Sequence, residues 1–295
     1  MKKTNIGILL GLSTYILWGF LSLFWKLLSG VNSYNTFSYR IVFTVLTMLL
    51  YMLISGNKAR YKNELGQLIS RKKDLFQMTM ASVLISLNWL VYIYAVSHNQ
   101  ATQASLGYYI MPLISILLSI VFLHEHLSVG MIFTILLAAT GVVVLILNTG
   151  HLPLVSLVLA FSFGLYGLIK KNISLSSDVA MLVESGIIFP FALIYLIFFS
   201  NESMLDYSLM ENVLLIISGV VTAIPLLLFT EAVKRAPLNI IGFIQYINPT
   251  IQLIIAVLIF KEAVTMGELK GFIFIWLAIG VFVLAQIVEM RKTHS

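Results

Sequence analysis

The sequence predicts an all-α integral membrane protein with ten transmembrane helices, arranged as two five-helix inverted repeats. Of the 295 residues, 60% are hydrophobic and only 10% are charged, whereas a soluble domain carries about 25% charged residues. Apolar stretches long enough to cross a bilayer core of about 30 Å follow one another along the whole chain. Several motifs of the first half also recur in the second half.

The apolar stretches are separated by short polar segments that leave no room for a soluble domain. They lie near residues 6–28, 34–54, 74–97, 101–123, 129–147, 153–170, 178–199, 211–233, 238–260 and 267–288. The longest gap, residues 55–73, predicts a short surface helix. The first stretch is too long for a signal-peptide core and is followed by no small-residue cleavage site, so we expect it to remain as a helix.

The positions of the basic residues predict the orientation, because Lys and Arg in short loops are retained in the cytoplasm. With ten spans, most of them fall on one side, and both termini are then cytoplasmic. These residues are Lys2, Lys3, Lys58, Arg60, Lys62, Arg71, Lys72, Lys73, Lys170, Lys171, Lys234, Arg235, Arg291 and Lys292. Lys261 and Lys270 are exceptions, and Glu262 and Glu268 lie beside them.

The composition also excludes several classes of function. The net charge is +6 and the pI is about 9.4, but the basic residues are spread between apolar stretches, so we expect no nucleic-acid partner. The chain has no cysteine, and hence no disulfide or thiolate metal site. We expect the lipid bilayer as a partner and no cofactor.

A duplication appears when the chain is compared with itself at an offset of 137 residues. Pro112, Glu125, Ser128 and Gly130 recur as Pro249, Glu262, Thr265 and Gly267. The repeats are predicted at residues 1–150 and 151–295. Because each contains an odd number of spans, the second enters the membrane from the opposite side, which is the architecture of many secondary transporters.

The repeated glutamates have a structural interpretation that we prefer. Glu125 and Glu262 each end a span, three residues before Ser128 or Thr265, which can cap the next helix. We therefore expect them to fasten hairpins. His124 and His126 flank Glu125 but point apart on a helix, so no metal site is predicted.

Two matched spans carry polar residues along one helical face. Tyr108, Pro112 and Ser115 coincide at the repeat offset with Gln245, Pro249 and Gln252. Each proline removes a backbone hydrogen bond that lipid cannot replace. Packing kinks and a water-filled cavity both explain the pattern, and we favour the cavity, with Pro112, Pro225 and Pro249 as helix breaks or gating points.

Arg40 and Glu184 lie about two turns inside their spans, where a charge costs at least about 2.5 kcal/mol. Both should face the protein interior. We hypothesise that Arg40 orients an anionic or polar group of a substrate, and that Glu184 either acts as a gate or binds a coupling cation, for which a proton is a candidate. The full set of candidate substrate-binding residues is Trp18, Arg40, Asn88, Trp89, Tyr108, Glu184, Gln245, Tyr246 and Asn248.

These motifs together resemble the RarD group of the EamA family, in the drug/metabolite transporter superfamily. The resemblance covers nearly the whole chain, and one departure is Thr230-Glu231, where the family has small residues. It is carried by Leu17-Trp18-Gly19, Tyr39-Arg40-Ile41, Leu87-Asn88-Trp89-Leu90, Gly107-Tyr108-Tyr109, Phe163-Gly164-Leu165-Tyr166-Gly167, Thr222-Ala223-Ile224-Pro225 and Gly242-Phe243-Ile244-Gln245-Tyr246. It implies a permease of the bacterial cytoplasmic membrane, with a central cavity lined by both halves and the fifth and tenth helices peripheral.

The sequence leaves alternatives open. An enzyme is not expected, because no clustered nucleophile, metal ligands or paired carboxylates are present. A channel or a membrane scaffold is the alternative to a transporter of a small metabolite, amino acid or drug-like molecule. Gly267 and Gly271 form a GxxxG pair, which leaves a homodimer open.

Overall fold

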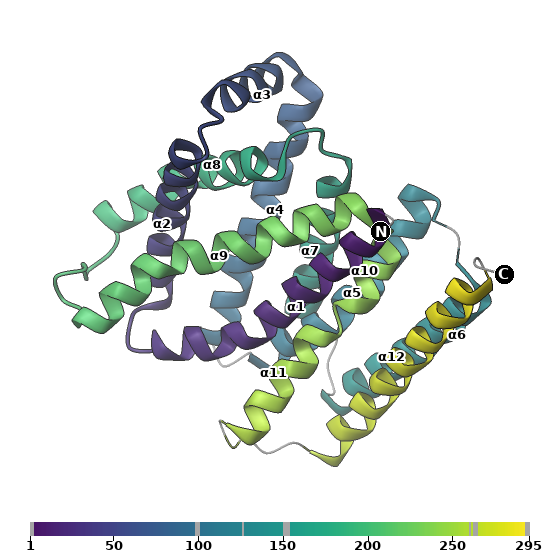
Figure 1. Ribbon diagram of the computed structural model, residues 1–295. Coiled ribbons are helices and arrows are strands. Elements are labelled where there is room, and N and C mark those ends of the chain that lie inside the picture. Colours follow the sequence, from purple (N-terminus) through teal and green to yellow (C-terminus); the bar gives the residue numbers. More distant parts are fainter. Residues whose placement is uncertain are drawn as a thin grey trace.

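The computed structural model describes residues 3–97, 101–125, 127–149, 154–259, 261 and 265–292. These residues form twelve α-helices and no strand (Figure 1). The helices are α1 (Lys3–Leu27), α2 (Ser33–Ile54), α3 (Lys58–Ser70), α4 (Lys72–Ser97), α5 (Ala101–Leu123), α6 (Val129–Thr149), α7 (Leu154–Asn172), α8 (Ser177–Phe198), α9 (Leu209–Arg235), α10 (Leu238–Ile244), α11 (Ile247–Leu258) and α12 (Met266–Lys292).

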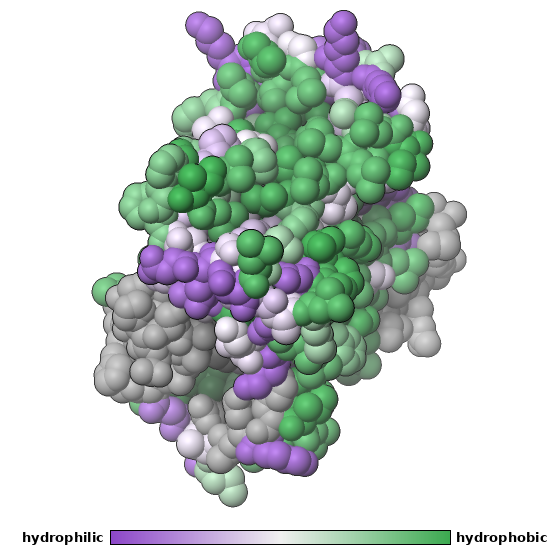
Figure 2. Space-filling model, turned by 90° about the vertical axis from the view of Figure 1, so that its left-hand side faces the viewer, coloured by the Kyte–Doolittle hydropathy of each residue, from purple (hydrophilic) through white to green (hydrophobic). Residues whose placement is uncertain are grey.

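The predicted all-helical membrane fold is confirmed. In the described part of the chain, nine helical stretches are long and apolar enough to span a membrane, and a shorter apolar stretch at Leu269–Ala285 belongs to α12. Large apolar side chains cover much of the face seen in Figure 2. Leu50, Phe191 and Leu284, for example, are 57%, 70% and 64% exposed. In water such a surface would aggregate, whereas lipid solvates it.

The ninth predicted span, 238–260, is two helices. Pro249 has no N–H to donate to the carbonyl of Gln245, and that carbonyl accepts from the N–H of Asn248 instead, at 3.1 Å. The chain therefore tightens between α10 and α11, four residues before the proline. By contrast, α5 and α9 continue unbroken through Pro112 and Pro225. Of the three predicted helix breaks, only the one at Pro249 interrupts a helix.

The helices of the two halves interleave. In the central bundle, α1 packs against α9, α10 and α11, while α2 packs mainly against α8 and α9. In the same way, α7, the first span of the second half, packs against α4 and α5 of the first half. Every central helix of the first half therefore packs mainly on helices of the second half.

The helices α6 and α12 form a separate pair at one side of the bundle (Figure 1). A Cβ on Gly267 would lie 1.9 Å from Oδ1 of Asn148, and one on Gly271 would lie 3.1 Å from the carbonyl of Gly141. The GxxxG pair is therefore used within the chain, to bring α12 close to α6. It does not supply a free surface for a second copy.

A non-glycine residue with a positive φ lies at the matching position of each half. Among the described non-glycine residues, only His124 (φ 52°) and Lys261 (φ 59°) adopt this conformation, and they are 137 positions apart. Each follows the end of a helix, α5 and α11 respectively. The backbone therefore adopts a left-handed conformation at matching positions of the two repeats.

One end of the bundle carries most of the cations, and we call it the basic end. There α3 docks on the connection between α7 and α8: Arg60 pairs with Asp178, and Glu64 accepts from the N–H and the Oγ of Ser176 at 2.7 and 2.8 Å. Lys171 closes the C-terminus of α9 by donating to the carbonyl of Ala236 at 2.8 Å. This end is tied together by ion pairs and helix caps.

At the opposite end, the α1–α2 and α8–α9 connections meet. Nδ2 of Asn35 donates to the Tyr207 hydroxyl at 2.7 Å, and that hydroxyl donates to Glu202 at 2.9 Å. Burial and the neighbouring Glu202 raise the pKa of Tyr207 to about 12, so the phenol remains a donor at neutral pH. Leu28 and Val31 of the first connection also pack in one apolar cluster with Tyr207 and Leu215, so hydrogen bonds and apolar contacts together join the two connections, without the ion pairs seen at the basic end among the described residues.

Candidate functional site

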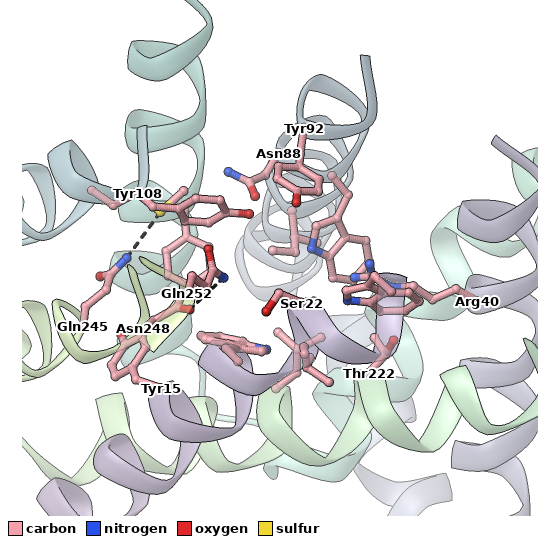
Figure 3. A pocket seen from close by; sticks show the side chains of 18 residues that line it. Tyr15, Ser22, Arg40, Asn88, Tyr92, Tyr108, Thr222, Gln245, Asn248 and Gln252 are labelled. Carbon is pink, nitrogen blue, oxygen red and sulfur yellow. Dashed lines mark hydrogen bonds between the residues drawn. The ribbon is translucent and has the colours of Figure 1, made fainter. Parts of the chain in front are cut away.

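A cavity of about 120 Å³ lies in the centre of the bundle, between helices of both halves (Figure 3). Its walls come from α1, α2, α4, α5, α7, α9, α11 and the break before α11. The lining residues are Tyr15, Trp18, Leu21, Ser22, Trp25, Arg40, Ile85, Asn88, Trp89, Tyr92, Tyr108, Met111, Phe163, Thr222, Leu226, Gln245, Asn248 and Gln252. Of these lining residues, Tyr15 and Asn88 are 1% and 4% exposed, whereas Tyr92 is 38% exposed.

Arg40 is the charged residue of this cavity. Its guanidinium carbon lies 3.9 Å from the ring centroid of Trp89 and 5.2 Å from that of Trp25, and such contacts stabilise a cation where water is scarce. Within the part of the chain that the structure describes, no Asp or Glu lines the cavity, and Nε of Arg40 is buried without a hydrogen-bond partner. The positive charge is held by aromatic rings and is not neutralised by a carboxylate.

Amide side chains are fixed around the same cavity. Asn88 donates through Nδ2 to the carbonyl of Leu159 at 2.8 Å and to Oγ of Ser162 at 3.0 Å, which sets the orientation of its amide. On the facing wall, Gln252 donates through Nε2 to Oδ1 of Asn248 at 3.0 Å. The cavity is therefore polar through neutral groups as well as through Arg40.

Five aromatic side chains close the cavity toward the basic end, and we call them the aromatic plug: Tyr15, Trp18, Phe163, Tyr166 and Phe229. The Trp18 ring lies 5.6 Å from Phe163 and 5.7 Å from Phe229, centroid to centroid. Tyr166 stacks on Phe229 at 5.9 Å and 12°. Rings in these arrangements attract one another beyond their buried area, so the plug is a packed layer that no substrate can cross without rearrangement.

Beyond the plug lies a buried ion pair. Nζ of Lys170 is 2.8 Å from Oε1 of Glu184, and the hydroxyl of Tyr166 donates to Oε2 at 3.1 Å. Lys170 is 0% and Glu184 3% exposed. Glu184 also borders a void of about 10 Å³ that shares Ile85, Trp89 and Leu226 with the main cavity, a size close to that of one water molecule.

The structure brings together seven of the nine candidate substrate-binding residues: Trp18, Arg40, Asn88, Trp89, Tyr108, Gln245 and Asn248 all line the cavity. Two lie elsewhere. Glu184 faces the interior, as expected, but is engaged by Lys170 behind the plug. Tyr246 is fully buried, and its hydroxyl finds no hydrogen-bond partner among the residues that the structure describes.

Three residues of the cavity and the ion pair were not identified from the sequence. Lys170 was counted only among the cytoplasmic cations, although it is buried with Glu184. Tyr92 follows Asn88 by four residues and so lies on the same helical face, a signal that could have identified it. Met111 accepts a hydrogen bond from Nε2 of Gln245 at 3.3 Å, and nothing in the pattern indicated this contact.

The predicted hairpin role of Glu125 requires correction. Its two carboxylate oxygens accept from the backbone N–H groups of Leu238 and Asn239 at 2.8 and 2.9 Å. These are free donors at the start of α10, where an anion is stabilised by the helix dipole. Lys171 lies 3.4 Å from the same carboxylate. Glu125 therefore joins the first half to the second.

The remaining hairpin predictions concern two caps and one further glutamate. Oγ of Ser128 accepts from the N–H of Met131 at 3.4 Å, at the start of α6. Thr265 directly precedes α12, and its carbonyl accepts from Leu269 at 3.0 Å. Glu262 lies outside the described residues.

Comparison with known proteins identifies the family. Residues 5–147 match the model of the EamA-like transporter family. The chain is 38% identical to the uncharacterized transporter YojE of Bacillus subtilis, covering 99% of this chain and 98% of that one. It is 36% identical to the protein RarD of Escherichia coli, over 100% and 99% of the two chains. The chain belongs to the EamA family, in its RarD group.

A solved crystal structure extends the likeness to the fold. It superposes on this EamA-family chain with a TM-score of 0.72 at 16% identity, covering 96% of this chain and 98% of the other. At that identity the likeness concerns the fold alone. The family match and the names of the relatives support a multi-pass transporter in a bacterial membrane. They give no indication of an enzyme.

Proposed function

We propose that this chain moves a small molecule across the bacterial cytoplasmic membrane as a secondary transporter, by alternating access of the central cavity. The observation that carries the proposal is the cavity itself: both halves line it, its rim at Tyr92 is exposed, and the aromatic plug closes its other side. A channel needs a continuous pore, whereas a transporter site is open to one side at a time.

The proposed resting conformation faces outward. The positive-inside rule assigns the basic end to the cytoplasm, and the plug lies between the cavity and that end. Both termini are then cytoplasmic. The matched left-handed backbone conformations at His124 and Lys261 support two repeats, 1–150 and 151–295, that exchange conformations to open the plug inward.

We assign the Lys170–Glu184 pair to the inner gate. A buried ion pair is stable only while its geometry is kept, because each charge alone is costly to bury. When the plug opens inward, water reaches Glu184 and the carboxylate becomes available to a proton. Glu184 is thus our candidate for coupling transport to a pH gradient.

The test is flux into proteoliposomes for a panel of labelled metabolites and drugs, with and without a pH gradient. We expect a saturable flux in the wild type, its loss in Arg40→Ala, and loss of its dependence on the pH gradient in Glu184→Gln. Arg71→Ala is the matched control, because this arginine has a side chain 62% exposed, outside the spans. Non-saturable single-channel currents in planar bilayers would contradict the proposal.

A further inference from the structure

The balance of charge in the cavity limits which molecules it can bind. Arg40 is the charged residue among those that line it, and Glu184, the nearby carboxylate, is already paired with Lys170 at 2.8 Å. A cationic ligand would therefore bring a second positive charge into a site that lacks a counter-ion, at high cost in a medium of low dielectric constant. An anion would supply the missing counter-ion.

Two donors in the cavity wall lack a partner. Among the described residues, Nε of Arg40 and Oγ1 of Thr222 are both buried without a hydrogen bond, and both side chains lie on the same side of the cavity (Figure 3). Most buried donors in proteins are satisfied, so unsatisfied donors on two residues that line the cavity point to an acceptor bound there. A guanidinium presents parallel donors that match the two oxygens of a carboxylate.

The size and the walls of the cavity restrict the rest of the ligand. Its volume is about 120 Å³, and a cavity of roughly 150 Å³ lined by apolar residues holds benzene. Rings of Trp18, Trp89 and Tyr108 form the walls, and flat rings stack favourably on such surfaces. Because the cavity is smaller than one that holds benzene, its ligand can carry at most a single planar ring with a short substituent.

We infer that the cavity binds small planar monocarboxylates, such as aromatic carboxylates, with the carboxylate on Arg40 and Thr222 and the ring among the tryptophans. A zwitterion is disfavoured, because its ammonium group would add a second cation beside Arg40 with no Asp or Glu among the described lining residues, and the rings of Trp25 and Trp89 already hold Arg40. The inference rests on the proposed transport function for its biological meaning, and on the cavity alone for its chemistry.

The test measures binding to the purified full-length protein by tryptophan fluorescence, since Trp18, Trp25 and Trp89 line the cavity and the chain has four tryptophans. The probes are benzoate, benzamide and benzylamine, which share one ring and differ in charge. We expect the affinity to fall in that order. Arg40→Gln should weaken benzoate binding about 10- to 100-fold, the range for a hydrogen bond to a charged group, and leave benzamide binding unchanged.

Controls separate charge from folding. Arg40→Lys should restore part of the preference for benzoate, and Arg71→Gln should leave all three affinities as in the wild type. If Arg40→Gln does not fold, the order of the three probe affinities for the wild-type protein tests the inference. The inference is overturned if benzoate does not bind, if benzamide or benzylamine binds as tightly, or if benzoate binding survives in a folded Arg40→Gln protein.

The measured outcomes distinguish a failure of this inference from a failure of the transport proposal. If the probes bind in the expected order but proteoliposomes show no flux of benzoate, the ligand class stands and the transport proposal does not. If another molecule shows saturable flux while benzoate and benzamide bind alike, transport stands and the anion preference is lost.

Discussion

At the scale of single residues, the charges inside the spans are the most informative positions. A membrane-embedded charge is so costly that it needs a local explanation, and this made Arg40 and Glu184 recognisable from the sequence alone. Their partners could not be predicted in the same way. Lys170 and Lys171 are adjacent cations at the end of a span, and they point in different directions from the helix. Lys170 is buried, whereas Lys171 has a side chain that is 21% exposed and reaches the end of α9.

The Lys170–Glu184 pair gives a prediction on stability. Lys170→Met and Glu184→Leu should each destabilise the protein by about 3–5 kcal/mol, because each leaves one buried charge without its partner. The double variant should be more stable than either single variant, since both charges are then absent. Thermal unfolding in detergent measures all three. Additive losses in the double variant would show that the two side chains are not coupled.

At the scale of helices, the spans could be predicted because apolar length is dictated by the bilayer. The break in the ninth span was expected at Pro249 but begins at Gln245, because the missing N–H acts on the carbonyl four residues earlier. Pro112 and Pro225 lie within continuous helices. A proline in a sequence thus locates a weakened hydrogen bond, and the neighbouring helices decide whether the helix breaks there.

Close contact between α2 and α9 depends on one glycine. A Cβ on Gly219 would lie 2.2 Å from the carbonyl oxygen of Phe43, a backbone atom that cannot move alone. We expect Gly219→Ala to destabilise the protein by about 1–3 kcal/mol, the usual cost of overpacking. Gly186→Ala in α8 is the matched control, because nothing lies within 4 Å of its added Cβ. Equal melting temperatures for the two variants would show that α2 and α9 can move apart without loss of stability.

At the scale of the whole molecule, the duplication was visible in the sequence, but the way in which the halves interleave was not. Matches at a fixed offset reveal two similar segments and say nothing about which surfaces meet. Glu125 illustrates the limit: its spacing to Ser128 suggested a local hairpin, while its carboxylate binds α10, 113 residues away. Long-range partners of this kind follow from the packing of the bundle.

The outward-facing arrangement can be tested by thiol labelling, since the chain has no cysteine of its own. Ser22 lines the cavity, whereas Thr230 is 1% exposed and lies behind the plug. In intact cells, Ser22→Cys should react with a membrane-impermeant maleimide, and Thr230→Cys should not. Adding Glu125→Gln, which weakens the cap on α10, should increase labelling of Thr230→Cys in inside-out vesicles. Labelling of Thr230→Cys from outside the cell would contradict the assigned orientation of the cavity.

The interleaving of the halves has a consequence for biosynthesis. Because α1, α2 and α4 find most of their packing partners among α7 to α11, the ribosome delivers them into the membrane before those partners exist. The rings of Trp25 and Trp89 that hold Arg40 belong to the first half, but α8 and α9, on which its helix α2 mainly packs, are made only with the second half. Assembly is therefore a late event that follows synthesis of the second half, and a nascent chain arrested after α6 is a natural target for membrane proteases.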